Sequence, residues 1–208
     1  MRWIDITAPL ENGMVCWPGD PEIDIRRIAA IEDGAEANLT TVSMCAHTGT
    51  HIDAPLHFRN EGVSMDAMPF DAVVGTARVI GIRDPHTIRE SELRMYGIRA
   101  GERILFRTRN SDGLSKERRF RGDFVYLAAD GARYLAACGI RATGIDYLSI
   151  GGGRDLGETH RILADASVWV IEGLDLSAIA PGDYEMICLP LRLRGAEGAP
   201  ARAFLRAV

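Results

Sequence analysis

Apolar and polar residues alternate along most of the chain, which predicts a protein built largely from strands. The segments with this alternation, or with a short β-branched apolar run, are 3–8, 22–31, 39–46, 73–82, 104–106, 124–128, 142–150, 168–171 and 183–193. A last strand is expected after the loop of small residues at 194–202. Residues 107–122 are predicted to form a charged, glycine-containing loop.

Helical patterns are confined to three short stretches, at 88–95, 130–139 and 161–166. We expect Asp130 to cap the second of these and Gly139 to end it. Many strands with few helices favour an α/β fold around a mixed sheet with flanking helices. With 208 residues and neither a repeat nor a linker, the chain is expected to form a single domain over residues 1–208.

Composition and charge exclude several classes of function. A hydrophobic content of 47% with 25% charged residues is typical of a soluble globular protein, and the net charge of −5 gives no indication of nucleic acid binding. No apolar run approaches the length of a membrane span, and the first residues do not resemble a signal peptide. We therefore expect a cytoplasmic protein. The four cysteines lack CxxC spacing and are predicted to be free thiols.

Residues 45–58 concentrate the side chains that carry chemistry. Three of the five histidines, His47, His51 and His57, lie here together with Asp53. Imidazole and carboxylate groups are the ligand types that suit Zn²⁺ or Mn²⁺. A single histidine in an apolar setting is usually a structural residue, but four such groups in one short stretch favour a metal site. Cys45 precedes His47 by two residues, and we do not expect it to be a ligand.

The backbone of this stretch has to bend. In a helix, Asp53 would lie about 200° round from His51. In an extended strand the side chains would point the same way, but His47 and His51 would be about 13 Å apart. Because ligand atoms lie about 2 Å from a metal, the chain must curl, and Gly49 and Pro55 are the expected bending points. We expect a strand end that curls into a loop around an ion.

Further candidates lie outside this stretch. His160 precedes the predicted helical stretch 161–166, and Glu172 ends the apolar run 168–171. A buried carboxylate is costly unless it is paired or binds a metal, so Glu172 is either a ligand or an exposed strand end.

Three further residues are considered for a role in the site. Trp17 and Asp146 each have two interpretations, and His86 has one. Trp17, in the turn-rich loop 11–21, is either a surface aromatic or the wall of a pocket for an aromatic substrate. Asp146 either supports the site from behind or caps a turn, and His86 is predicted to be a solvated loop residue.

The sequence from His47 to His57, His-Thr-Gly-Thr-His-Ile-Asp-Ala-Pro-Leu-His, resembles the His-x-Gly-Thr-His-x-Asp-x-Pro-x-His signature of the cyclase-like metal-dependent hydrolases. That superfamily includes bacterial kynurenine formamidase (arylformamidase), which this chain resembles most, and isatin hydrolase. The Trp-Pro-Gly-Asp segment at 17–20 and the Leu-Pro-Leu motif beginning at Leu189 extend the resemblance over nearly the whole chain. It implies a swivelling β/β/α architecture.

The resemblance also implies a site. It assigns five metal ligands, with Asp53 free to bridge two divalent ions through its two oxygens. These ligands are His47, His51, Asp53, His160 and Glu172. We expect zinc, with manganese as the alternative, because ligand chemistry does not decide between them. Trp17 would contact the substrate. His57 has a side chain suited to acid–base work near neutrality, and we expect it to pass a proton to the leaving nitrogen.

The implied activity is that of a metal-dependent amidohydrolase. It would cleave N-formylkynurenine, a small aromatic amide, to kynurenine and formate in tryptophan breakdown. The alternatives are another cyclic amide such as isatin, a lactone or a carbamate, and a structural metal site in a binding protein. Structural zinc sites are usually closed and often contain cysteine, which does not fit this cluster. By resemblance alone, we expect a homodimer or a larger homo-oligomer.

Overall fold

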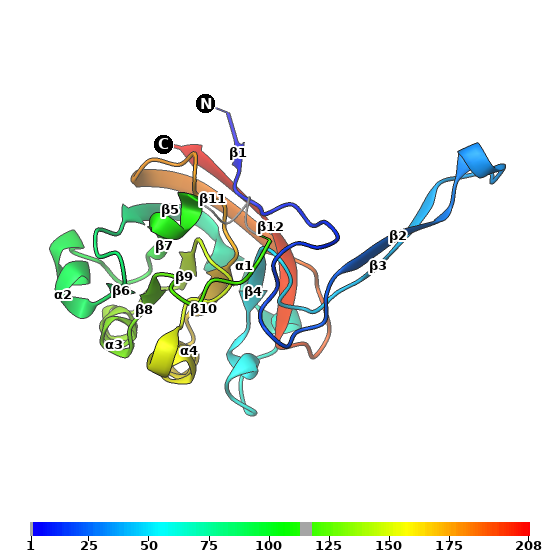
Figure 1. Ribbon diagram of the computed structural model, residues 1–208. Helices are drawn as coiled ribbons and strands as arrows, with labels where there is room; N and C mark the ends of the chain where they lie inside the picture. The colour runs from blue at the N-terminus through cyan, green and yellow to red at the C-terminus, as the bar shows by residue number, and fades with distance from the viewer. Residues whose placement is uncertain (1, 113–117) are drawn as a thin grey trace.

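A single large sheet forms the centre of the computed structural model, which describes residues 2–112 and 118–208. Its strand order is β1-β12-β11-β5-β7-β9-β10-β4, and β12 also pairs with β4. This additional pairing closes the sheet into a barrel-like ring, with β1 attached to it at β12 (Figure 1). The strands are β1 (Ile4–Asp5), β4 (His51–Asp53), β5 (Val74–Gly81), β7 (Arg103–Arg107), β9 (Ala142–Ile145), β10 (Trp169–Glu172), β11 (Gly182–Pro190) and β12 (Gly198–Ala207).

One half of the ring is parallel and the other is antiparallel. Strands β5, β7, β9 and β10 run parallel, and β4, β11 and β12 pair antiparallel with their neighbours. Parallel neighbours require crossover connections, which here contain α2 (Glu90–Leu93), α3 (Ala129–Cys138) and α4 (Leu156–Asp165). These helices lie together along one side of the ring (Figure 1). The single-turn helix α1 (Phe70–Val73) leads into β5. The fold is therefore a mixed sheet with flanking helices, as predicted.

Alternation along the parallel strands divides the core into two layers. Val79, Leu105 and Ile171 pack in the cluster that fills the ring. Their neighbours Ile80 and Phe106 pack in a second cluster, between the ring and the helices. Because both faces of these strands are buried, the parallel half of the sheet is a rigid support for groups at its ends.

A two-stranded hairpin projects away from the ring (Figure 1). It consists of β2 (Asp24–Ala29) and β3 (Leu39–Ser43), which pair antiparallel only with each other among the described strands. Four large apolar side chains of this hairpin are more than half exposed, namely Ile28, Ile31, Leu39 and Val42. A second small pair, β6 (Thr87–Ile88) and β8 (Tyr126–Leu127), lies near α3.

Several predicted boundaries need correction. The strand predicted at 142–150 ends at Ile145, and beyond it Asp146 bonds to the loop at 108–111 and Ile150 bonds to Leu127 and Glu172. The last strand begins at Gly198, inside the predicted loop 194–202. Helix α4 begins at Leu156, so His160 lies in its middle. Gly139 ends α3 in the left-handed conformation as predicted, but Ala128 is the N-cap and Asp130 lies inside the first turn.

Two other expectations from the sequence concern the chain as a whole. The four cysteines are free, as predicted. No helix within residues 2–112 and 118–208 is long and apolar enough to cross a membrane, and the cytoplasmic location stays a prediction. Residues 113–117 of the predicted charged loop lie outside the described residues.

Candidate metal centre

The stretch with three histidines bends at both predicted points. Gly49 adopts a left-handed φ of 68° and turns the chain into β4. Pro55 then starts a short 3₁₀ helix that ends at His57, whose ring stacks on His47 with 4.1 Å between ring centroids. The expectation of a strand end that curls into a loop was only partly right. Strand β3 ends at Ser43, and a turn at 46–50 precedes β4 as a new short strand.

Strand β4 places two donor side chains by register alone. His51 and Asp53 are two residues apart in one strand, so both project to the same face. His51 lies directly opposite Glu172 in the antiparallel pairing of β4 with β10. On its other edge β4 pairs with β12, where Gly198 lies opposite Asp53. Two strands that are far apart in sequence thus bring a histidine and two carboxylates together.

The five predicted ligand residues converge on one point. One donor atom from each of His47, His51 and Asp53 lies within 4.8 Å of the others, and the same holds for Asp53, His160 and Glu172. Asp53 belongs to both groups. Its Oδ1 lies 2.8 Å from Nδ1 of His47 and 3.3 Å from Nε2 of His51, and its Oδ2 lies 3.8 Å from Nε2 of His160. Donors about 3 Å apart suit a metal with ligands at about 2 Å.

Two of the histidine rings are oriented by backbone carbonyls. Nδ1 of His51 donates to the carbonyl of Gly49 at 3.0 Å, and Nδ1 of His160 donates to that of Leu156 at 2.8 Å. Each bond leaves Nε2 directed at the carboxylates, with Glu172 3.4 Å from His51 and 3.1 Å from His160. Metal-binding histidines typically donate their second nitrogen in this way.

The polar atoms of this cluster are not satisfied by the protein. Nε2 of His47, Nε2 of His51 and Oδ2 of Asp53 are buried without a hydrogen-bond partner. Such atoms cost free energy in a folded protein unless something binds them. Their residue types are those that divalent cations prefer, so the donors present fit a metal.

The charges of the cluster also suit a cation. Burial disfavours the charged form of Asp53, but the hydrogen bond from His47 and the nearby imidazole of His51 outweigh it and hold the pKa of this carboxyl well below its usual range. Burial by itself would lower the pKa of His51, yet Asp53 and Glu172 raise it to about 10. Burial lowers the pKa of His57, which favours its neutral form.

Glu172 is a buried residue rather than an exposed strand end. Only 3% of its surface is accessible, and Oε1 also accepts a hydrogen bond from the backbone of Ile150 at 2.7 Å. The exposed alternative left open by the sequence is therefore wrong. Cys45 belongs to neither donor group among the described residues.

Further residues that the sequence did not reveal pack closely around the histidines of the cluster. A Cβ on Gly198 would lie 2.6 Å from the ring of His47, and one on Gly151 would lie 2.9 Å from the ring of His160. Oε1 of Glu197 is 3.4 Å from Nε2 of His47. Gly198 and Glu197 contact a histidine that is far away in the sequence, so no local pattern could have identified them.

A cavity of about 250 Å³ opens beside the cluster. Trp17 lies in its wall, together with Phe58, whose ring stacks on His160 with 4.4 Å between centroids. Trp17 also packs edge-on against Phe120 and Phe124, at centroid distances of 5.0 and 6.2 Å. Of the two interpretations of Trp17, the structure favours a pocket wall.

Asp146 secures the loop behind this aromatic wall. It is buried and accepts hydrogen bonds from the backbone N–H of Thr108 at 2.7 Å and of Ser111 at 3.1 Å, and from both hydroxyls. Asn110, held between them, exchanges two hydrogen bonds of 2.9 Å with the backbone of Val125. These four hydrogen bonds go to the turn at 108–111, so Asp146 caps that turn and supports the loop beside the aromatic wall.

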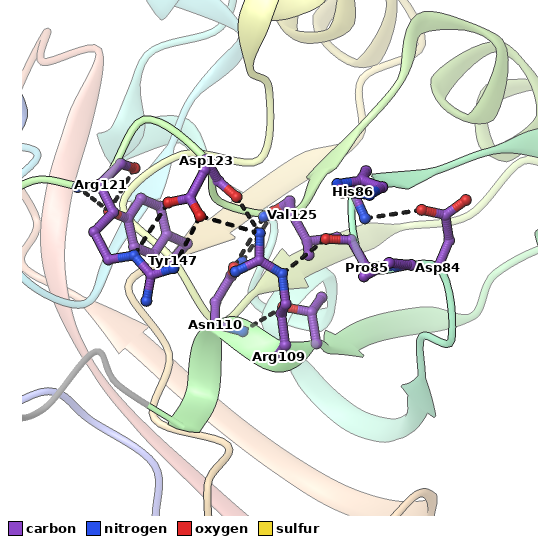
Figure 2. Close-up of polar contacts among 10 residues, drawn as sticks. Asp84, Pro85, His86, Arg109, Asn110, Arg121, Asp123, Val125 and Tyr147 are labelled. Carbon is purple, nitrogen blue, oxygen red and sulfur yellow. Dashed lines mark hydrogen bonds and ion pairs between the residues drawn. The ribbon is translucent and has the colours of Figure 1, made fainter.

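Figure 2 shows the rest of this support. Arg109 reaches the carbonyl of Pro85 at 2.7 Å and pairs with Asp123, and Arg121 pairs with Asp123 at 3.0 Å. His86 is exposed in the neighbouring turn, where its backbone N–H donates to Asp84 at 2.8 Å. It is a solvated loop residue, as predicted.

Comparison with known proteins identifies the family. The family described as putative cyclase matches residues 4–151. The chain belongs to this cyclase family. It is 36% identical over 209 residues to a protein named kynurenine formamidase from Bacillus anthracis, covering 100% of this chain and 98% of the relative. A kynurenine formamidase from Bacillus cereus (strain ATCC 10987) is 37% identical with the same coverage.

Solved structures agree with this cyclase fold. A protein described as a potential metal-dependent hydrolase with cyclase activity superposes with a TM-score of 0.86 at 36% identity, covering 98% of this chain and 96% of that one. Isatin hydrolase A from Labrenzia aggregata has a TM-score of 0.86 at 22% identity, covering 99% and 93% of the two chains. At that identity the likeness concerns the fold alone.

The contact between Gly198 and His47 gives a test of the cluster in this cyclase-family protein. In Gly198→Ala the new methyl group would displace the imidazole, because 2.6 Å is below any real carbon contact. We expect the affinity for Zn²⁺ to fall by about 10-fold to 100-fold, the usual cost of disturbing the support of a ligand. Competition with a chromogenic chelator measures it.

A matched control is Gly122→Ala, where the added carbon would meet its nearest neighbour at an ordinary 3.8 Å. This variant should bind zinc like the wild type. Circular dichroism checks that both variants are folded. Unchanged zinc affinity in folded Gly198→Ala would show that the position of His47 does not matter for binding.

Proposed function

We propose that this protein is a metal-dependent amidohydrolase that converts N-formyl-L-kynurenine to L-kynurenine and formate in tryptophan degradation. The observation that carries the proposal is the pair of donor groups that share Asp53, because four of their five residues line a cavity that Trp17 also lines. Relatives with the name kynurenine formamidase align over the whole chain, which supports this substrate. The substrate is a small aromatic amide that fits an aromatic-walled cavity.

We assign two divalent metal ions to the cluster, with zinc expected and manganese as the alternative. His47, His51 and Asp53 would hold one ion, and Asp53, His160 and Glu172 the other. When bound, such ions supply Lewis acidity, which polarises a carbonyl and lowers the pKa of a water molecule. The two ionised carboxylates balance part of the cationic charge.

His57 is assigned the proton transfer. It lines the cavity, belongs to neither donor group among the described residues, and is favoured in its neutral form by burial. A neutral imidazole can take a proton from the attacking water and deliver it to the anilino nitrogen as the bond between that nitrogen and the formyl carbon breaks. Trp17 would hold the aromatic ring of the substrate against the wall.

A second candidate keeps the chemistry and changes the substrate to a cyclic amide such as isatin. The fold shared with isatin hydrolase A is the observation that favours it. A purely structural metal site fits less well. Structural zinc sites are closed, and here the donors adjoin an open cavity of about 250 Å³.

We also propose that the protein forms a homodimer through the β2–β3 hairpin. An isolated two-stranded hairpin is marginally stable in water, and this one exposes more than half of Ile28, Ile31, Leu39 and Val42. In a symmetric dimer, the β2–β3 hairpin of a second copy would cover these side chains with the same apolar surface.

The proposed function is tested on metal-stripped protein supplied with Zn²⁺ or Mn²⁺. We expect hydrolysis of N-formylkynurenine, followed by the absorbance of kynurenine, to be absent without metal and restored by one of the ions. Isatin is assayed in parallel. Protein that binds metal but turns over only isatin would replace the proposed substrate with the second candidate.

His57→Ala tests the proton transfer. We expect kcat to fall by about 10²-fold to 10⁴-fold, the typical contribution of a positioned acid or base, with the metal content unchanged. Metal analysis of the purified variant provides the control. If His57→Ala lost its metal or kept full activity, the assignment of proton transfer to His57 would be wrong.

Aspartates on the hairpin test the dimer. The double variant Ile28→Asp and Leu39→Asp should be monomeric by light scattering at concentrations where the wild type is dimeric, because buried unpaired carboxylates oppose association. The control is Met95→Asp, which changes a similarly exposed apolar residue (65%) away from the hairpin. A wild-type monomer would refute the proposal directly.

A further inference from the structure

Asp20 lies in the cavity beside the metal cluster but is not one of the predicted metal ligands. It lines the same cavity as Trp17, His57 and Glu172, and it belongs to neither donor group among the described residues. Within residues 2–112 and 118–208, no hydrogen bond or ion pair joins its carboxylate to another residue, while Glu172 is bonded to His160 and Ile150. Asp20 is therefore available to a ligand.

A tight turn fixes Asp20 beside Trp17. Residues 17–20 form a β-turn in which the backbone N–H of Asp20 donates to the carbonyl of Trp17 at 3.0 Å. Pro18 and Gly19, with its φ of 98°, occupy the positions that a type II turn favours. Trp17 in turn is packed against Phe120 and Phe124. The aromatic wall and the carboxylate are thus held at the two ends of one rigid unit.

Apart from the histidines and Glu172, Asp20 is the charged residue of the described cavity lining. Among the described residues, the cavity lining contains no lysine or arginine. Away from the metal cluster, a substrate carboxylate therefore finds no lysine or arginine in the described wall, whereas a substrate ammonium group finds Asp20. An ammonium group donates up to three hydrogen bonds and pairs well with a carboxylate.

We propose that Asp20 accepts hydrogen bonds from the α-ammonium group of the substrate and so selects aryl formamides that carry an amino acid side chain. This inference rests on the proposed function, because N-formylkynurenine is such a compound. When the aromatic ring of the substrate lies against Trp17 and its formyl group lies at the metal cluster, its amino acid end is the part that remains to contact the turn at 17–20. Asp20 determines which substrate binds, and it does not contact the bonds that are broken or formed.

The test compares two substrates in wild-type protein and Asp20→Asn. One is N-formylkynurenine, and the other is 2′-formamidoacetophenone, which keeps the ring, ketone and formamide but lacks the amino acid group. We expect Asp20→Asn to raise KM for N-formylkynurenine by about 10-fold with kcat little changed, in the range of one charge-assisted hydrogen bond. KM and kcat for the uncharged compound should stay unchanged.

Glu22→Gln is the matched control, since it removes the same charge from an exposed residue two positions away that does not line the cavity. It should leave both substrates unaffected. A second test uses the wild-type protein alone. KM for N-formylkynurenine should rise as NaCl is raised to about 0.5 M, because salt screens a half-exposed ion pair, and KM for the uncharged compound should not.

The outcomes separate the two proposals. If Asp20→Asn impairs both substrates equally, or if salt leaves both KM values unchanged, the role of Asp20 is refuted while the formamidase activity stands. If metal-loaded wild type hydrolyses the uncharged formamide but not N-formylkynurenine, the substrate and the ammonium contact are both wrong. If it hydrolyses neither compound, the proposed function itself fails.

Discussion

The pairing of β4 on both of its edges is the constraint on which the rest of the molecule depends. This strand of three residues closes the ring between β10 and β12, and the same register sets His51 opposite Glu172. A slip of one residue would turn His51 and Asp53 to the other face of the sheet and disperse the donors. Closing the fold and assembling the cluster are therefore one event, and the packed parallel strands hold the register in place.

The cluster itself opposes folding. Two ionised carboxylates and three imidazoles are gathered where little water reaches, and several of their polar atoms have no partner in the protein. Buried charges of this kind are tolerated when they are paired and when the surrounding structure is stable enough to bear them. The ring provides that stability through its two apolar layers, and a bound cation would remove the remaining cost.

Sequence patterns predicted the sheet-rich fold and the donor cluster at 47–57 because both leave local signals, whereas His160 and Glu172 were assigned as ligands through the family resemblance. Alternation marked the strands, and the dense run from His47 to His57 marked the cluster. The errors arose where contacts between distant segments decide the structure. Helix α4 begins before His160, and β12 begins at Gly198 within an apparent loop. The contacts of Gly198 with His47, and of Asp146 with Thr108, join positions that only the folded chain brings together.

The ring and part of the cavity wall are built by different segments of the chain. Structures at 36% and at 22% identity superpose on this chain with the same TM-score of 0.86, so the ring is retained at low sequence identity. The wall depends in part on a loop outside the ring. Here the wall is the turn of Trp17 and Asp20, braced by aromatic rings that Asp146 and Asn110 tie back to the sheet. Because this brace is independent of the donor register, the residues of this turn can change without disturbing the cluster.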